Sequence, residues 1–238
     1  MKGWDGLINS WQKSFFSIPF YLFLSAFALV VCIIFHRREK IGFLFFAYLL
    51  FDIVISCLDD YNIYFSKLNR KESSRILNLS NGLIYIIEFF VYSFFFFFVL
   101  KYKSSKKTLI LLLLLFCLAS AYYLGVGFSQ QNNLYIRKLS NFLAALEYLF
   151  LVIISLLYYF ELFTLEPKDD LLKKPSFWVT SGIFIMALLS LPYILVDFTL
   201  VFNKVFNHTL TVFFYYMPIC FNSIFLTKAL LCKKPLSI

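Results

Sequence analysis

Long apolar runs, separated by short polar segments, are the feature that most constrains this chain. Of its 238 residues, 61% are hydrophobic and only 15% are charged, and the mean hydropathy is +0.81. Phe alone occurs 33 times. A water-soluble fold of this length could not bury so much apolar surface. The sequence therefore predicts an integral membrane protein.

The lengths of the runs predict about seven transmembrane helices, because a spanning helix needs about 20 mostly apolar residues. The expected helices cover residues 15–35, 41–58, 77–100, 108–126, 141–163, 177–201 and 208–231. The segments between them are too short for a soluble domain. We therefore expect one all-α, polytopic bundle over residues 1–238. The longest connection, 59–76, is expected to be a loop with a short interfacial helix.

The distribution of Lys and Arg predicts the orientation of the bundle. If the N-terminus lies outside, thirteen of the 22 basic residues fall in inside segments and nine in outside segments. Because basic residues favour the cytoplasmic side, we expect N-out and C-in, although the cluster at 67–75 points the other way. The net charge of +9 lies in clusters between the apolar runs, so we expect contact with lipid headgroups rather than nucleic acid.

Among the acidic residues of the predicted helices, four stand out, which are Asp52, Glu88, Glu147 and Asp197. Such residues are costly in a bilayer and are candidates for function. In the N-out orientation they lie at the midplane or in the outer half. No Lys or Arg is expected at matching depth, so each acid would be protonated, hydrogen-bonded, or bound to a cation or amine. Alternatively, neutral acids hold the helices together through hydrogen bonds.

Other polar side chains are expected on the same side of the membrane, whereas the inner half is more apolar, as in 94–100. This asymmetry predicts a polar cavity open to the outside. The candidate ligand- or cation-binding residues are Asp52, Glu88, Glu147, Tyr85, Tyr148, Asn81 and His208.

Catalytic and cofactor-binding motifs are missing from the sequence. It has no Gly-x-Ser-x-Gly, His-Glu-x-x-His or phosphate-binding loop. The two histidines, His36 and His208, are expected on opposite sides of the membrane and cannot share a metal. A retinal-binding lysine is also missing, because Lys228 lies at the inner end of the last predicted helix. We therefore expect no enzyme activity, no metal and no cofactor.

One segment carries a resemblance to known proteins. Residues 158–162 read Tyr-Tyr-Phe-Glu-Leu, and 174–182 read Lys-Pro-Ser-Phe-Trp-Val-Thr-Ser-Gly. Together with the surrounding stretch from Glu147 to Pro192, this resembles small bacterial membrane proteins similar to the seven-helix sensor region found before, or encoded next to, histidine kinases. The resemblance implies a sensory role in a bacterial inner membrane. No kinase domain follows Leu231 in this sequence, so we expect a separate partner.

These observations favour a membrane sensor or receptor-like subunit. Its acidic outer cavity would take a small cationic or polar ligand, or a proton, and a separate cytoplasmic signalling protein would receive the signal. Two alternatives remain open. The chain could be a structural, pore-forming or interaction subunit of a membrane complex, or it could be a small cation carrier or channel.

Overall fold

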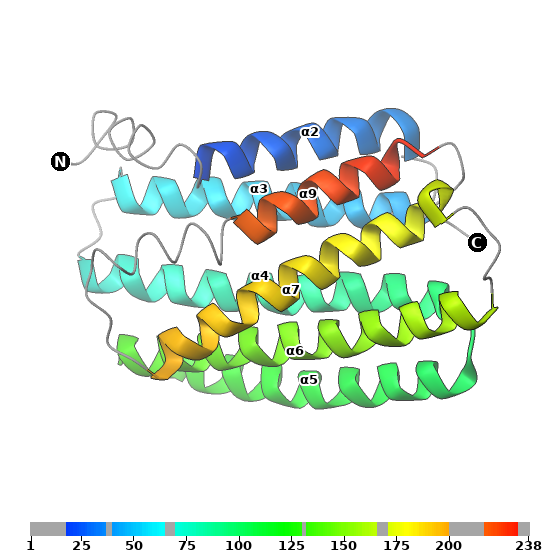
Figure 1. The fold of residues 1–238 in the computed structure, drawn as a ribbon. Helices are drawn as coiled ribbons and strands as arrows, with labels where there is room; N and C mark the ends of the chain where they lie inside the picture. Colours follow the sequence, from blue (N-terminus) through cyan, green and yellow to red (C-terminus); the bar gives the residue numbers. More distant parts are fainter. Residues whose placement is uncertain are drawn as a thin grey trace.

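The computed structural model describes residues 18–36, 40–64, 70–129, 132–165, 171–199 and 217–232. This part of the chain is all-helical and runs as a bundle of roughly aligned helices (Figure 1). Its elements are α2 (Ile18–His36), α3 (Lys40–Tyr64), α4 (Arg70–Val99), α5 (Lys103–Ser129), α6 (Asn133–Leu165), the short 3-10 helix η1 (Leu171–Lys173), α7 (Pro175–Thr199) and α9 (Met217–Leu230).

Five of these helices are long and apolar enough to cross a membrane. The apolar spans are Gly42–Asn62, Glu72–Val99, Lys103–Gly127, Asn133–Leu165 and Pro175–Leu195. Two shorter apolar stretches, Phe20–Ile34 and Met217–Leu230, belong to α2 and α9. Each of the seven predicted runs thus overlaps a helix, although residues 15–17, 200–201 and 208–216 of the predicted helices lie outside the described part of the chain.

The predicted loop over 59–76 is wrong at both ends. α3 continues to Tyr64 and α4 begins at Arg70, so only 65–69 lies outside the described helices. The polar residues in this stretch remain helical because they contact the neighbouring helix. The Ser80 hydroxyl donates to an Asp59 carboxylate oxygen over 2.9 Å, and the Ser73 hydroxyl donates to the carbonyl of Asn62 over 3.5 Å.

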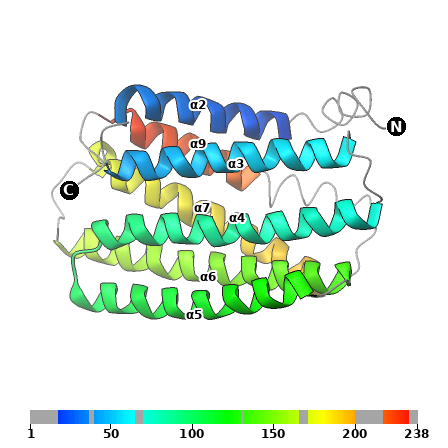
Figure 2. The same ribbon diagram turned by 180° about the vertical axis from the view of Figure 1, so that it is seen from behind.

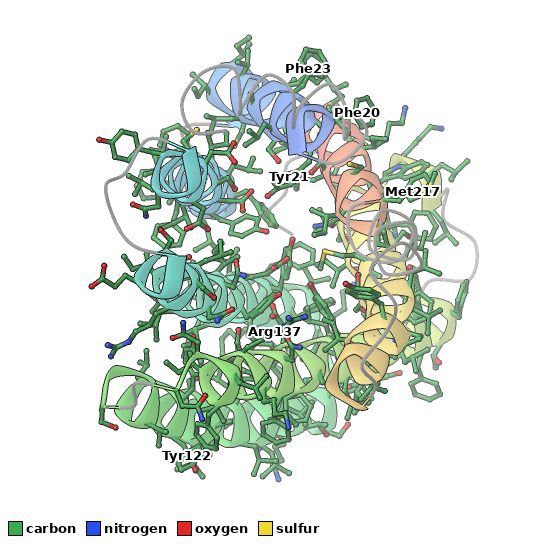
Figure 3. All side chains as sticks on the ribbon, turned by 90° about the vertical axis from the view of Figure 1, so that its left-hand side faces the viewer. Phe20, Tyr21, Phe23, Tyr122, Arg137 and Met217 are labelled. Atoms are coloured by element: carbon green, nitrogen blue, oxygen red, sulfur yellow. The ribbon has the colours of Figure 1, made fainter. Side chains whose placement is uncertain are left out.

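The helices close into a ring. α2 packs on α3, α3 on α4, α4 on α6, α6 on α7, α7 on α9, and α9 returns to α2, while α5 lies outside the ring against α4 and α6. Figures 1 and 2 show α5 along one edge of the bundle from both sides. A view from the end that carries the α3–α4 connection shows the ring along its axis (Figure 3). The interior of this ring holds the candidate site.

The surface of this bundle is far more apolar than that of a water-soluble protein, and several acidic side chains are buried inside it. Phe23 and Leu118 are 66% and 70% exposed, whereas Glu147 is completely buried. The outer surface is rich in exposed Phe and Leu, including the Phe94, Phe97 and Phe98 side chains of α4. A largely apolar exterior is what a lipid environment favours, since lipid does not penalise exposed apolar groups.

A candidate cation-binding cavity

A cavity of about 260 Å³ lies inside the ring. Its walls come from five helices, α2, α3, α4, α6 and α9. The lining residues are Tyr21, Tyr48, Asp52, Ser56, Asp59, Asp60, Leu77, Asn81, Ile84, Tyr85, Glu88, Tyr148 and Ile219. In the end-on view, Tyr21 points from α2 towards the middle of the bundle, whereas Phe23 points away from it (Figure 3). Among the described residues that line the cavity, none is Lys, Arg or His.

The deep part of the cavity contains two carboxyl groups. The Tyr21 hydroxyl donates to Asp52, and the Tyr48 hydroxyl donates to Oε1 of Glu88 over 3.1 Å. Asp52 and Glu88 are close enough for their charges to interact, and both are buried, at 4% and 5% exposure. Two neighbouring carboxylates without a basic partner repel each other, so this level of the cavity favours a proton or a cation.

The floor beneath Glu88 is a hydrogen-bonded and aromatic layer. Tyr92 also lies within hydrogen-bonding reach of Glu88. The Tyr92 hydroxyl oxygen accepts a hydrogen bond from Nδ2 of Asn222 over 2.6 Å. Below it, the Phe45 and Phe95 rings lie 5.8 Å apart. The floor therefore links α4 to α9 and separates the cavity from the opposite end of the bundle.

The outer part of the cavity contains a second acidic pair, Asp59 and Asp60, one to two turns from the end of α3. Asp59 accepts from the Ser80 hydroxyl, and the neighbouring Asn81 lines the same part of the wall. Sequence analysis missed this pair because the charges of 59–76 were interpreted as a loop. The spacing of Asp52, Ser56 and Asp59, at i, i+4 and i+7, was the signal that could have found it, because these positions share one helix face.

Glu147 lies on α6 next to this cavity rather than in its lining. It is completely buried, and neither carboxylate oxygen has a hydrogen-bond partner in the described part of the chain. Its charge interacts with that of Glu88, and also with the Tyr48 and Tyr92 hydroxyls of the cavity floor. An unpaired carboxyl at this depth is unfavourable unless something else compensates it.

The structure brings together most of the residues that the sequence singled out. Asp52, Asn81, Tyr85, Glu88 and Tyr148 all line the cavity, and their role in binding stays a prediction. His208 lies outside the described residues, and so does the side chain of Asp197. Sequence analysis also missed Tyr21 and Tyr48, because a single tyrosine in an apolar run carries no signal for the direction it faces.

Within the described residues, no three His, Cys, Asp or Glu side chains are grouped so that they could hold a metal ion. The lining also contains four tyrosines, whose ring faces attract cations and whose hydroxyls can donate or accept. Carboxyl groups and tyrosines in one cavity can interact with an organic cation or a proton.

The fold and the cavity define the class of this protein: a multi-pass integral membrane bundle with an acidic interior cavity. Comparison with known proteins adds no closer identification, because no protein-family model, curated protein or solved structure matches the chain.

Proposed function

We propose that this chain is the sensing subunit of a membrane signalling system. Its cavity binds a small organic cation from the outer side, and a separate cytoplasmic partner responds. The observation that carries the proposal is a buried cavity with four carboxyl groups and no basic side chain among its described lining residues. A cationic ligand would relieve the repulsion between these acids and would interact with the tyrosine rings.

The proposal includes the arrangement in the membrane. The chain crosses a bacterial inner membrane seven times, with its N-terminus outside and its C-terminus inside. In this orientation, the Asp59–Asp60 end of the cavity faces outwards. The distribution of Lys and Arg supports the orientation, and the resemblance of 147–192 to the sensor region associated with histidine kinases supports the sensory role.

The first experiment measures binding by the purified protein in lipid nanodiscs, with calorimetric titration of small ammonium compounds. Glu88→Gln should weaken binding of the best compound at least about tenfold, because it removes one charge-assisted interaction. Glu72→Gln is the matched control, since Glu72 lies on the same helix but is exposed at its first turn. Equal affinities for the Glu88 variant and the native protein would refute the proposed site.

Signalling needs a separate readout, since binding alone does not demonstrate it. Glu88→Gln should abolish the response of the native cell to the ligand while the amount of inserted protein stays unchanged. Native mass spectrometry of the protein released gently from its own membrane should detect the ligand on the chain. A normal response in cells carrying Glu88→Gln would contradict the sensing role.

A cation carrier is the second candidate, and one observation favours it. Acidic residues occur at successive depths, from Asp59 through Asp52 to Glu88, as expected along an ion pathway. Flux of an organic cation into liposomes, lost on Glu88→Gln, would identify a carrier. Binding without flux would support the sensor.

A further inference from the structure

The acidic residues of α3 form two separate levels in the cavity. Asp52 and Asp59 are seven residues apart, which is two helical turns, so both carboxyl groups share one face of α3. Their separation along the helix axis is about 10 Å. Both line the same cavity.

The opposite wall repeats this spacing on α4. Asn81 and Glu88 are also seven residues apart, and both line the cavity. Tyr48 contacts Glu88 while Asp59 contacts Ser80, so α3 and α4 run antiparallel. This register places Glu88 opposite Tyr48, within about one turn of Asp52, and places Asn81 within about one turn of Asp59. The cavity therefore has a deep polar level and an outer polar level.

The wall between the two levels is mostly apolar and aromatic. Ile84 and Tyr85 lie between Asn81 and Glu88 on α4, and Tyr148 of α6 contacts Tyr85 with ring centroids 6.3 Å apart. Ser56 contributes one hydroxyl on α3. A band of this kind suits a methylene chain, whereas the polar levels suit charged ends.

Glu147 provides an independent indication of a cation at the deep level. It is completely buried, has no hydrogen-bond partner among the described residues, and interacts electrostatically with Glu88. Glu88 thus interacts with an acidic residue on each side, Asp52 in the cavity lining and Glu147 next to it. Tyrosine hydroxyls donate to Asp52 and Glu88, whereas no described residue donates a hydrogen bond to Glu147. A positive charge bound between Asp52 and Glu88 would interact favourably with both, and its field would also extend to Glu147.

We propose that the cavity binds an elongated aliphatic diamine or polyamine, with one ammonium at the Asp52–Glu88 level and a second at the Asp59–Asp60 level. This inference rests on the proposed function and adds its ligand class. A monoamine would leave one acidic level unoccupied, and a compact dication could not reach both.

A chain-length series on the native protein tests the inference directly. Diaminobutane, diaminohexane, diaminooctane and diaminodecane are titrated calorimetrically into protein-containing nanodiscs, and empty nanodiscs correct for partition into lipid. Affinity should rise with length to a maximum where the two nitrogens are separated by about 10 Å, the spacing of the two acidic levels. Butylamine, hexylamine and octylamine should each bind at least about tenfold more weakly than the diamine that matches the spacing.

Two variants assign the ends of the ligand. Asp59→Asn should lower diamine affinity towards that of the monoamine and leave monoamine affinity unchanged, because the single ammonium occupies the deep level. Glu88→Gln should lower the affinity for both the diamine and the monoamine. Glu72→Gln should change neither, and size-exclusion chromatography of each variant checks that it remains folded.

The outcomes separate this inference from the proposed function. Amine binding without any dependence on chain length, or equal affinity for matched monoamines and diamines, would overturn the diamine inference and leave a cation-binding cavity. An Asp59→Asn variant with unchanged diamine affinity would overturn it as well. If no amine in the series binds the native protein, both the inference and the proposed organic-cation site fail.

Discussion

Substitution of Glu147 by Met distinguishes a ligand-binding carboxyl from one that holds helices together. Met has a similar volume and no charge, and Glu147 has no hydrogen bond to lose in the described part of the chain. A buried polar group without a partner costs about 1–3 kcal/mol in protein mutational data. Glu147→Met should therefore raise the free energy of unfolding by about 1–3 kcal/mol, while it weakens diamine binding.

Glu161 is the matched control on the same helix. It is also buried, but its oxygens accept hydrogen bonds from the backbone N–H groups of Lys101 and Tyr102 over 2.5 and 3.1 Å. Both N–H groups lie in the α4–α5 connection, just before α5 begins at Lys103, where no intrahelical partner is available. A hydrogen bond to a charged group contributes about 1.5–3 kcal/mol, so Glu161→Met should lower stability by at least that amount.

The assay is thermal unfolding of both variants in one detergent, followed by near-ultraviolet circular dichroism. For a chain of this size, each kcal/mol corresponds to a shift of about 2–4 °C in Tm. The expected result is an increase for Glu147→Met and a decrease for Glu161→Met. A decrease of similar size in both variants would show that Glu147 stabilises the bundle through hydrogen bonds, and the argument for its role in ligand binding would be refuted.

Two further predictions concern packing and orientation. A Cβ atom on Gly82 would overlap the buried Tyr123 ring, whereas one on Gly125 would meet nothing within 4 Å. Gly82→Ala should thus destabilise the protein by about 1–3 kcal/mol, and Gly125→Ala should stabilise it by up to about 1 kcal/mol; equal Tm values for the two variants would contradict this packing. Cys232 follows α9, so with the C-terminus inside, an impermeant maleimide should label it only after the membrane is opened, and labelling in sealed cells would reverse the orientation. Burial raises the pKa of the Cys232 thiol and Lys228 lowers it in part, so labelling should keep accelerating above the usual thiol pKa as the thiolate forms.

The apolar runs were enough to predict the helices, because in lipid the backbone must satisfy its hydrogen bonds within each segment. They were not enough to predict where the helices end. The charges of Asp59 and Asp60 resemble a loop in one dimension, but in the fold Asp59 accepts a hydrogen bond from Ser80 and both residues line the cavity. That contact depends on the register of α3 against α4, which no local pattern specifies.

Only the acidic residues of the candidate site could be predicted from the sequence. Buried carboxyl groups are rare in membrane helices, so Asp52 and Glu88 stood out by type alone. Tyrosine is common in this chain, with 16 copies, so type alone does not distinguish Tyr21 or Tyr48 from the others. Tyr21 and Tyr48 can be identified only from the closed ring of helices, in which their hydroxyls donate to the carboxyl groups of Asp52 and Glu88.

The proposed sensing role and the alternative of transport place different demands on the two ends of the bundle. A carrier must open both ends of its pathway in turn, but below Glu88 the Phe45 and Phe95 rings lie 5.8 Å apart, and the Asn222 side-chain amide donates a hydrogen bond to Tyr92 across the ring. Opening this end would separate many packed aromatic contacts. A ligand bound at Glu88 would instead act on a hydrogen-bond network that extends to α9, since Tyr92 connects Glu88 to Asn222. Asn222 packs closely against Gly182 of α7, where even an added Cβ would come within 2.8 Å of its side-chain oxygen. A small shift of Tyr92 on ligand binding would therefore move α9 against α7, with the cavity floor still closed.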